Sequence, residues 1–223
     1  MARDRRMLWF GGAGVLVAGV VALQLSQRPS HPLGPASSMR QGAAPATNRA
    51  LTVRRPSDQP MQRAIVVAPQ QREADIWFGK GTAALSAGRT DEAIAAFQKA
   101  TRLEPDWARA HHNLGFAYDK AGRDEEAAGS YRLAILLDPS EPETHNNLGG
   151  VYVKLDRYED AVKEFQQAIA LKREHAEAHL NLGIAYLLLG DADRAQDTAA
   201  KLARLNRAMA EELERLIRQA EAR

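Results

Sequence analysis

The chain has 223 residues, a formal net charge of +2 and no cysteine. The lack of cysteine excludes disulfides, thiolate metal sites and thiol catalysis. The charge is divided unevenly, since residues 1–73 carry ten arginines, no lysine and three acidic residues, whereas residues 74–223 carry 20 basic and 25 acidic residues. Because phosphate binding requires a basic face, this mildly acidic C-terminal part argues against nucleic acid as a partner.

The N-terminus combines a basic start with an apolar run. Residues 1–6 contain three arginines, and residues 7–25 contain no charged side chain. A helix over 7–25 would be about 28 Å long, close to the ~30 Å hydrocarbon core of a bilayer. We therefore predict a transmembrane signal anchor at 7–25, with residues 1–6 kept in the cytoplasm by their arginines. Val20-Val21-Ala22 also offers a cleavage signature, so a processed, secreted protein is the alternative.

Three small residues, Gly14, Ala18 and Ala22, lie four residues apart in this apolar run. They fall on one stripe of a helix, and small residues in that arrangement allow two membrane helices to pack closely. A homodimer through this stripe is one interpretation. The other is that glycine and alanine are common in membrane helices.

Residues 26–73 differ in composition from both neighbours. They contain seven of the ten prolines and seven arginines, without a helical apolar period. Such a segment buries too little apolar surface to offset the entropy of ordering, so we predict a disordered linker. The short apolar stretch 64–68 is a candidate clasp against the following domain. The arginines suit either solvation of the linker or attraction to anionic groups such as lipid headgroups.

From Ala74 onward the sequence repeats four times at a spacing of 34 residues, without a gap. Each row contains two blocks of apolar and small residues at helical spacing, which predicts two amphipathic helices per row. Gly88, Gly122 and Asp156 separate the blocks and suit short turns. The shared columns are a glycine column (Gly81, Gly115, Gly149, Gly183), an alanine column (Ala93, Ala127, Ala161, Ala195) and an aromatic column (Phe97, Tyr131, Phe165, with Ala199 out of pattern).

This period and these columns resemble the tetratricopeptide repeat family. The resemblance implies an all-α superhelical solenoid in which helical hairpins stack, because one hairpin cannot bury its apolar face alone. Arg207 stands where a proline would normally end the repeat, so we expect the fourth repeat to continue into the cap with little interruption. The expected units are three full repeats at 74–107, 108–141 and 142–175, a degenerate fourth repeat at 176–207 and a capping helix at 208–223.

No constellation of residues supports catalysis or metal binding. His111, His145 and His179 form a column, but Trp77 occupies the same column in the first row. Neighbouring helices lie about 8–10 Å apart, whereas zinc ligands lie about 2 Å from the ion, so we interpret the column as a packing position. No serine has a plausible base and oxyanion partner. We predict a protein that is not an enzyme and has no cofactor or metal.

The family resemblance implies that the first helix of each repeat lines a concave groove that binds a protein or an extended peptide. Asn113, Asn147 and Asn181 recur directly before a Leu-Gly pair. In the repeats of O-linked N-acetylglucosamine transferase, asparagines of this column hold a peptide main chain, and a carboxamide can donate and accept at once. The alternative is that asparagine is simply frequent in this column of the family. The other predicted groove residues are Arg109, His112, Phe116, Asn146, Ile184 and Leu188.

Together these observations predict a non-catalytic scaffold for protein–protein interaction. We expect a single-pass inner-membrane protein with a cytoplasmic N-terminus and its repeats on the periplasmic, extracytoplasmic side. A secreted module and a structural subunit that self-associates through its repeats are the alternatives.

Overall fold

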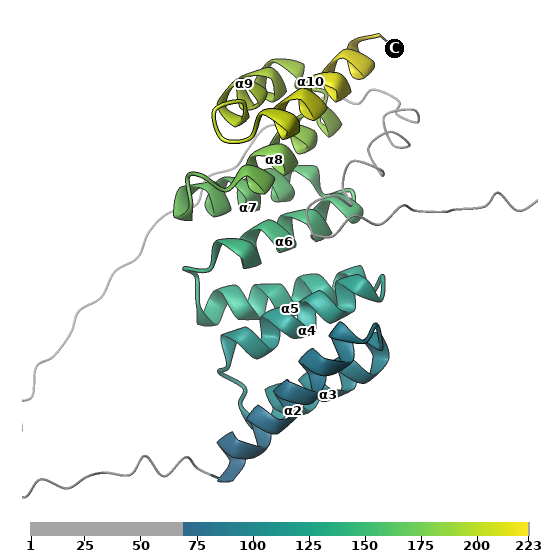
Figure 1. Cartoon of the computed structure of the whole chain (residues 1–223), viewed down its shortest axis with the longest axis vertical. Coiled ribbons are helices and arrows are strands. Elements are labelled where there is room, and N and C mark those ends of the chain that lie inside the picture. Colours follow the sequence, from purple (N-terminus) through teal and green to yellow (C-terminus); the bar gives the residue numbers. More distant parts are fainter. Residues whose placement is uncertain (1–68, 223) are drawn as a thin grey trace, which may run out of the picture.

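The computed structural model describes residues 69–222, so the predicted cytoplasmic segment, the membrane anchor and nearly all of the linker lie outside the described residues. Residues 69–222 form helices and no strands (Figure 1). None of these helices is long and apolar enough to cross a membrane. The helices are α2 (Pro69–Ser86), α3 (Thr90–Leu103), α4 (Ala108–Lys120), α5 (Asp124–Leu137), α6 (Pro142–Lys154), α7 (Tyr158–Leu171), α8 (Ala176–Leu188), α9 (Ala192–Leu202) and α10 (Arg207–Glu221).

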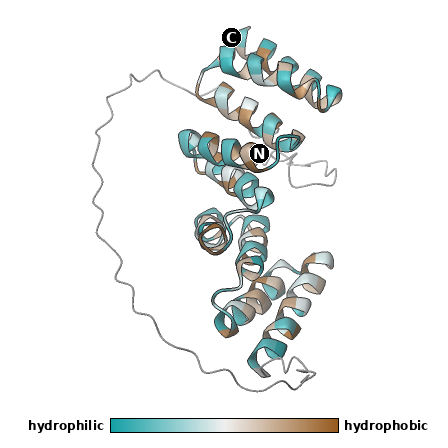
Figure 2. Cartoon of the chain, turned by 90° about the vertical axis from the view of Figure 1, so that its left-hand side faces the viewer, coloured by the Kyte–Doolittle hydropathy of each residue, from teal (hydrophilic) through white to brown (hydrophobic). Residues whose placement is uncertain are grey.

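Consecutive helices pair into four hairpins, α2–α3, α4–α5, α6–α7 and α8–α9, and α10 follows the last hairpin. The second helix of each hairpin packs against the first helix of the next, so the hairpins stack along the long axis (Figure 1). The helices carry hydrophobic and hydrophilic residues together (Figure 2). The stack buries the hydrophobic sides in one continuous core. The predicted all-α solenoid is therefore confirmed.

The turns inside the hairpins adopt left-handed backbone conformations. Gly88, Gly122 and Gly190 have φ of 72°, 71° and 80°, and Asp156 has φ of 57° in the corresponding turn of the third hairpin. Glycine adopts this region without steric cost, and aspartate is among the few other residues that visit it. The Asp156 carboxylate also accepts a hydrogen bond from the Tyr158 hydroxyl, which holds the turn.

The glycine column marks the closest approach within the first three hairpins. A Cβ added to Gly149 would lie 2.6 Å from the ring of Phe165, and one added to Gly81 would lie 2.6 Å from the ring of Phe97. Gly115 faces Tyr131 in the same way. Each ring comes from the second helix of the same hairpin, and all three rings are fully buried.

The fourth hairpin fills this space with a residue from outside the hairpin. Ala199 stands in the aromatic column and is too short to reach Gly183. Instead, the side chain of Leu213 on α10 packs against Gly183, and Leu213 is fully buried. The capping helix thus completes the fourth repeat as well as covering it.

The prediction that the fourth repeat continues into the cap was wrong. Helix α9 ends at Leu202 and α10 begins only at Arg207. Asn206 is extended, with φ of −153°, and its side chain accepts a hydrogen bond from the Met209 N–H at 3.1 Å. This N-cap satisfies a backbone donor at the start of α10 and makes a proline unnecessary for the break.

The N-terminal end of the array is finished differently. No hairpin precedes α2 in the described residues, and Ile76 is 57% exposed where its counterpart Ala110 is fully buried. Lys80 replaces the leucine found in the later repeats. The ammonium groups of Lys80 and Lys99 lie 4.0 and 3.8 Å from the ring centre of Trp77, so two cations cover this aromatic side chain.

Candidate functional site

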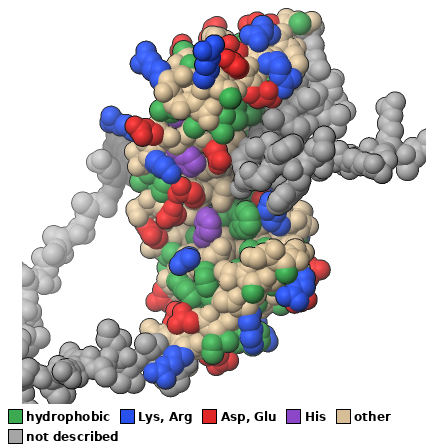
Figure 3. Space-filling view, viewed as in Figure 1, with side chains coloured by type: hydrophobic (Ala, Val, Ile, Leu, Met, Phe, Trp, Pro, Cys, Tyr) green, Lys and Arg blue, Asp and Glu red, His purple; other side chains and the backbone are tan. Residues whose placement is uncertain are grey.

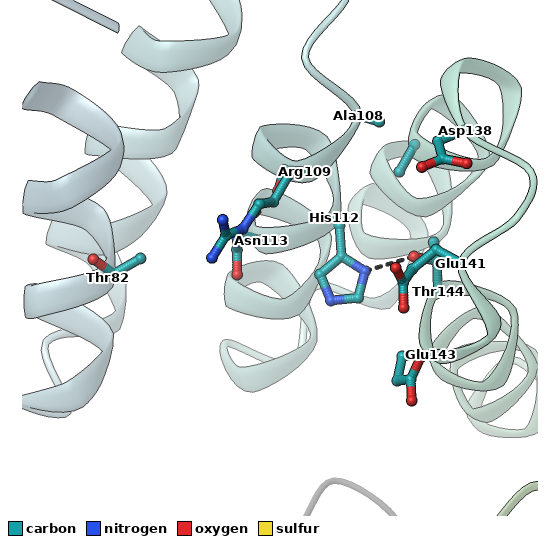
Figure 4. Close-up of a pocket in the computed structure, with 10 residues that line it drawn as sticks. Thr82, Ala108, Arg109, His112, Asn113, Asp138, Glu141, Glu143 and Thr144 are labelled. Carbon is teal, nitrogen blue, oxygen red and sulfur yellow. Dashed lines mark hydrogen bonds between the residues drawn. The ribbon is translucent and has the colours of Figure 1, made fainter. Parts of the chain in front are cut away.

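A cavity of about 500 Å³ opens between α2, α4 and α6, with the end of α5 forming part of its wall (Figure 4). The face of the molecule seen in Figure 3 exposes acidic and basic side chains interspersed with apolar ones. Ten residues line it. Thr82 comes from α2, and Ala108, Arg109, His112 and Asn113 come from α4. Ala134 belongs to α5, Asp138 directly follows α5, Glu141 directly precedes α6, and Glu143 and Thr144 lie in the first turn of α6. We call this cavity the groove.

His112 and Thr144 join α4 to α6 across the floor of the groove. The Nδ1 atom of His112 lies 2.8 Å from the Thr144 hydroxyl oxygen (Figure 4). The imidazole ring also packs edge-on against Tyr131, with 5.5 Å between ring centres. Burial lowers the pKa of His112, and the nearby Arg109 adds to this, while Glu143 opposes it. His112 is therefore a neutral hydrogen-bonding group at pH 7.

Three carboxylates, Asp138, Glu141 and Glu143, line the α6 side of the groove, and we call them the acidic wall. Glu141 and Glu143 lie close enough to share one hydrogen bond when Glu141 is protonated, which raises the pKa of Glu141 and lowers that of Glu143 to about 2. Glu143 also accepts a hydrogen bond from Lys172 at 3.2 Å. The hydroxyl and N–H of Ser140 hold Asp138 and lower its pKa. The wall is thus held in place by its own hydrogen bonds.

One cation, Arg109, faces the groove from α4. Its guanidinium lies 5.3 Å from the ring centre of Phe78 on α2, and the side chain is exposed. Arg109 and Thr82 lie toward α2, whereas Glu141 and Glu143 lie toward α6 (Figure 4). The two sides of the groove therefore carry opposite charge.

The three asparagines of the predicted ladder have different surroundings. Asn113 lines the groove, and its Nδ2 donates to the Arg109 carbonyl at 3.0 Å. Asn147 is half-buried and lies near Tyr131, whose pKa burial raises, but it does not belong to the groove lining. Asn181 is 2% exposed and donates to Asn146 at 3.0 Å, so this pair links α8 to α6.

The remaining predicted groove residues separate into two groups. Arg109, His112 and Asn113 come together around one cavity. Phe116 is half-buried beside Lys120, whose ammonium lies 5.1 Å from its ring centre. Neither Phe116 nor Asn146 lines that cavity, and Ile184 and Leu188 are 0% and 2% exposed.

Sequence reasoning missed part of the site. Asp138 and Glu141 belong to the turn between α5 and α6, and Thr144 is 2% exposed. The acidic cluster over 138–143 was visible in the sequence. The positions of Asp138 and Glu141 on the groove were not visible, because neither residue belongs to the first helix of a repeat.

The histidine column has a structural role. In each case Nε2 lies near the backbone carbonyl six residues earlier, at 2.8 Å for His111, 3.3 Å for His145 and 3.0 Å for His179. These contacts fasten the turn that precedes each first helix. Within residues 69–222 no group of three or more potential ligands is arranged to hold a metal ion.

Comparison with protein families identifies the repeats. A model described as TPR repeat matches residues 81–122 and 149–190. Two further models described as tetratricopeptide repeat match residues 108–141 and 177–207. Together these matches extend over more than half of the chain. A search of curated proteins gives no match.

Solved structures share the fold. The crystal structure of MamA protein is 25% identical, with a TM-score of 0.60, and the match covers 68% of this chain and 87% of that one. The Pseudomonas aeruginosa pilF structure is 26% identical, with a TM-score of 0.59 and coverage of 69% and 71%. A Thermobaculum terrenum O-GlcNAc transferase mutant is 26% identical, with a TM-score of 0.56, and the match covers 62% of this chain but 27% of the transferase. The chain belongs to the tetratricopeptide repeat family.

Proposed function

We propose that the repeat domain binds an extended peptide segment of another protein in the groove and carries out no reaction. The observation that supports this most directly is the groove itself, an open cavity of about 500 Å³ lined by polar side chains from three successive repeats. Recognition sites for other molecules are typically concave, with a few polar groups in fixed positions. The fold is typical of non-catalytic scaffolds for protein–protein interaction.

The polar groups of the groove suit a peptide main chain. A carboxamide has two N–H donors and an oxygen acceptor, so Asn113 keeps one donor and its oxygen after bonding to the Arg109 carbonyl. Asn147 occupies the same column one repeat later. Arg109 offers a guanidinium that can bind a carboxylate through two hydrogen bonds. A peptide lying across α4 and α6 would meet these groups in succession.

The pairing of Thr144 with His112 resembles a nucleophile and its base, so catalysis needs a separate argument. A nucleophile has to reach its substrate. Thr144 is 2% exposed, and its hydroxyl is already bonded to the imidazole. The burial of Thr144 therefore favours a structural role for the pair over a catalytic one.

The same proposal includes attachment to a membrane. The apolar run 7–25 and the arginines before it support a single anchor with the repeats on the non-cytoplasmic side, where they would contribute to an envelope assembly. Washing isolated membranes with alkaline carbonate tests the attachment. Retention of the full chain in the pellet is expected, and release into the wash would instead favour the secreted form.

Blocking the groove tests peptide binding. A peptide is first selected from a random library on the full chain in detergent micelles, and its affinity is measured by calorimetry. Thr82→Trp fills the groove from α2, whereas Ser86→Trp places the same ring one turn later, outside the lining. Each original hydroxyl donates only to a carbonyl of its own helix, so the two variants are matched. We expect Thr82→Trp to weaken binding of the selected peptide at least tenfold and Ser86→Trp to leave it unchanged. Equal affinities for the two variants would refute the proposal.

A further inference from the structure

The charges that line the groove determine which kind of peptide segment matches it best. Its lining carries three carboxylates and one guanidinium, and Lys172 offsets only part of the charge on Glu143. Arg109 lies on the opposite side, toward α2 (Figure 4). Electrostatic complementarity between surfaces favours encounter and fixes the register of a bound segment. A segment with guanidinium groups therefore matches the acidic wall better than an acidic or apolar one.

The same chain carries such a segment. Residues 40–63 contain five arginines, no lysine and one acidic residue, Asp58. Two of the arginines, Arg54 and Arg55, are adjacent and are followed by Pro56. A residue before proline favours extended backbone, and guanidinium groups bind carboxylates through paired hydrogen bonds. The segment therefore carries the charge that matches the acidic wall, and Pro56 favours extended backbone at Arg55.

The covalent connection is long enough. Thr82, at the α2 side of the groove, lies about 20 Å along the helix from Pro69 at 1.5 Å per residue. An extended chain spans about 3.3 Å per residue, so Arg54 and Arg55 can lie up to about 50 Å from Pro69. A segment tied to its site by a short flexible connection has an effective concentration on the order of millimolar. Even millimolar affinity would fill about half of the sites.

We propose that Arg54 and Arg55 bind the acidic wall of the groove in their own chain. The proposal rests on the peptide-binding function proposed above and names one ligand of that site. An external peptide would then compete with residues 40–63 for the groove. The first repeats would be partly occupied until a stronger peptide displaced this segment.

Distance measurements test the contact in the full chain. Because the chain has no cysteine, Ser57→Cys and Ala121→Cys provide two unique positions for nitroxide labels. Pulsed electron resonance in detergent micelles at low salt should show a short, narrow distance population. Arg54→Gln with Arg55→Gln should remove it, and so should Glu141→Gln with Glu143→Gln.

A matched control removes the same number of charges elsewhere. Glu125→Gln with Glu159→Gln takes away two exposed carboxylates outside the groove lining and should leave the short population in place. An identical distance distribution in all of these variants would overturn the proposal. Loss of the short population in the control as well would show attraction to net charge instead of to the acidic wall, and would also overturn it.

A second measurement separates this inference from the proposed function. A fluorescein-labelled peptide of residues 46–63, added in trans, should bind the full chain about twofold more tightly when Arg54→Gln and Arg55→Gln are present, because the internal competitor is lost. No binding in trans, together with unchanged distances, refutes the inference alone, since the Thr82→Trp comparison still decides whether the groove binds peptides. Equal effects of Thr82→Trp and Ser86→Trp on the selected peptide refute the function.

Discussion

The first three hairpins and the fourth differ in how they complete their own cores. In the first three, the column glycine faces a buried aromatic ring of the same hairpin, as Gly149 faces Phe165. In the fourth, Gly183 faces Leu213, which belongs to α10. The hairpins that line the groove are thus internally complete, whereas the fourth depends on the cap. Stability in a solenoid is the sum of such local terms, so the two regions should respond separately to mutation.

The two regions also differ on their exposed sides. Helix α4 presents half-buried polar residues to the groove, including His112 and Asn113, whereas residues 178–188 of α8 are buried throughout. The candidate site is therefore confined to the first three repeats. The fourth repeat and α10 form the packed end of the array.

Removal of the cap should have the largest effect. Ending the chain after Asn206 deletes Leu213, Leu216 and Ile217, which are at most 4% exposed. Burying each such side chain contributes about 1.5–3 kcal/mol, so the loss amounts to about 4.5–9 kcal/mol as an upper estimate. Hydrogen exchange should accelerate in α8 and α9 while α4 to α7 stay protected. Uniform acceleration along the whole array would contradict the separation of the two regions.

A smaller effect is expected at the glycine column. Gly149→Leu would force a side chain against the Phe165 ring and should destabilise the fold by about 1–3 kcal/mol or more. The neighbouring Gly150 provides a control, because a Cβ there meets nothing within 4 Å. Gly150→Leu should melt close to the unmodified protein. Similar melting temperatures for the two variants would contradict the assignment of the column.

Most of the architecture could be predicted from the sequence because it is repeated. A period of 34 residues and fixed small and aromatic columns specify two helices per repeat and their stacking. Because proline is missing at Arg207, the sequence predicted little interruption before the cap. The chain nevertheless breaks before α10, since Asn206 provides an N-cap through its side chain. The partnership of Gly183 with Leu213 was also hidden, because it joins residues from different units.

The site was less predictable, for a physical reason. Column position identifies the side of a helix but not the neighbour that its side chain meets. Asn113 and Asn181 share a column, yet one lines the groove and the other is buried against Asn146. Residues in the turns, such as Glu141, reach the groove without belonging to any first helix. The peptide-binding role of the asparagines stays a prediction.

Two histidines, one on α4 and one on α6, should make the stability of the fold depend on pH in opposite directions. The hydrogen bond that His145 Nδ1 donates to the Glu164 carboxylate raises the pKa of His145, so its contribution to stability is present below pH 6.5 and is lost as the pH rises through the folded value. Burial lowers the pKa of His112, so its contribution is present above pH 6.5 and is lost as the pH falls.

Variants separate the two contributions. Glu164→Gln should lower the urea midpoint at pH 5.5 more than at pH 8.5, because it removes the partner of protonated His145. His112→Gln should lower the urea midpoint more at pH 8.5 than at pH 5.5, because it removes a contribution that neutral His112 makes above pH 6.5. These are the smallest effects expected here. Equal shifts at both pH values in both variants would show that neither histidine is linked to folding.

The central claim is that Asn113 and Asn147 hold a bound peptide through their carboxamides, and calorimetry on one double variant tests it most directly. Asn113→Ala with Asn147→Ala leaves the buried Asn146–Asn181 pair intact, while Gln167→Ala with Gln196→Ala removes two exposed carboxamides elsewhere. Each net hydrogen bond contributes about 0.5–1.5 kcal/mol, so losing one per asparagine predicts about 5- to 150-fold weaker binding of the selected peptide. The account predicts this loss with an unchanged melting temperature and no loss in the glutamine control, and unchanged affinity in the asparagine variant would contradict it.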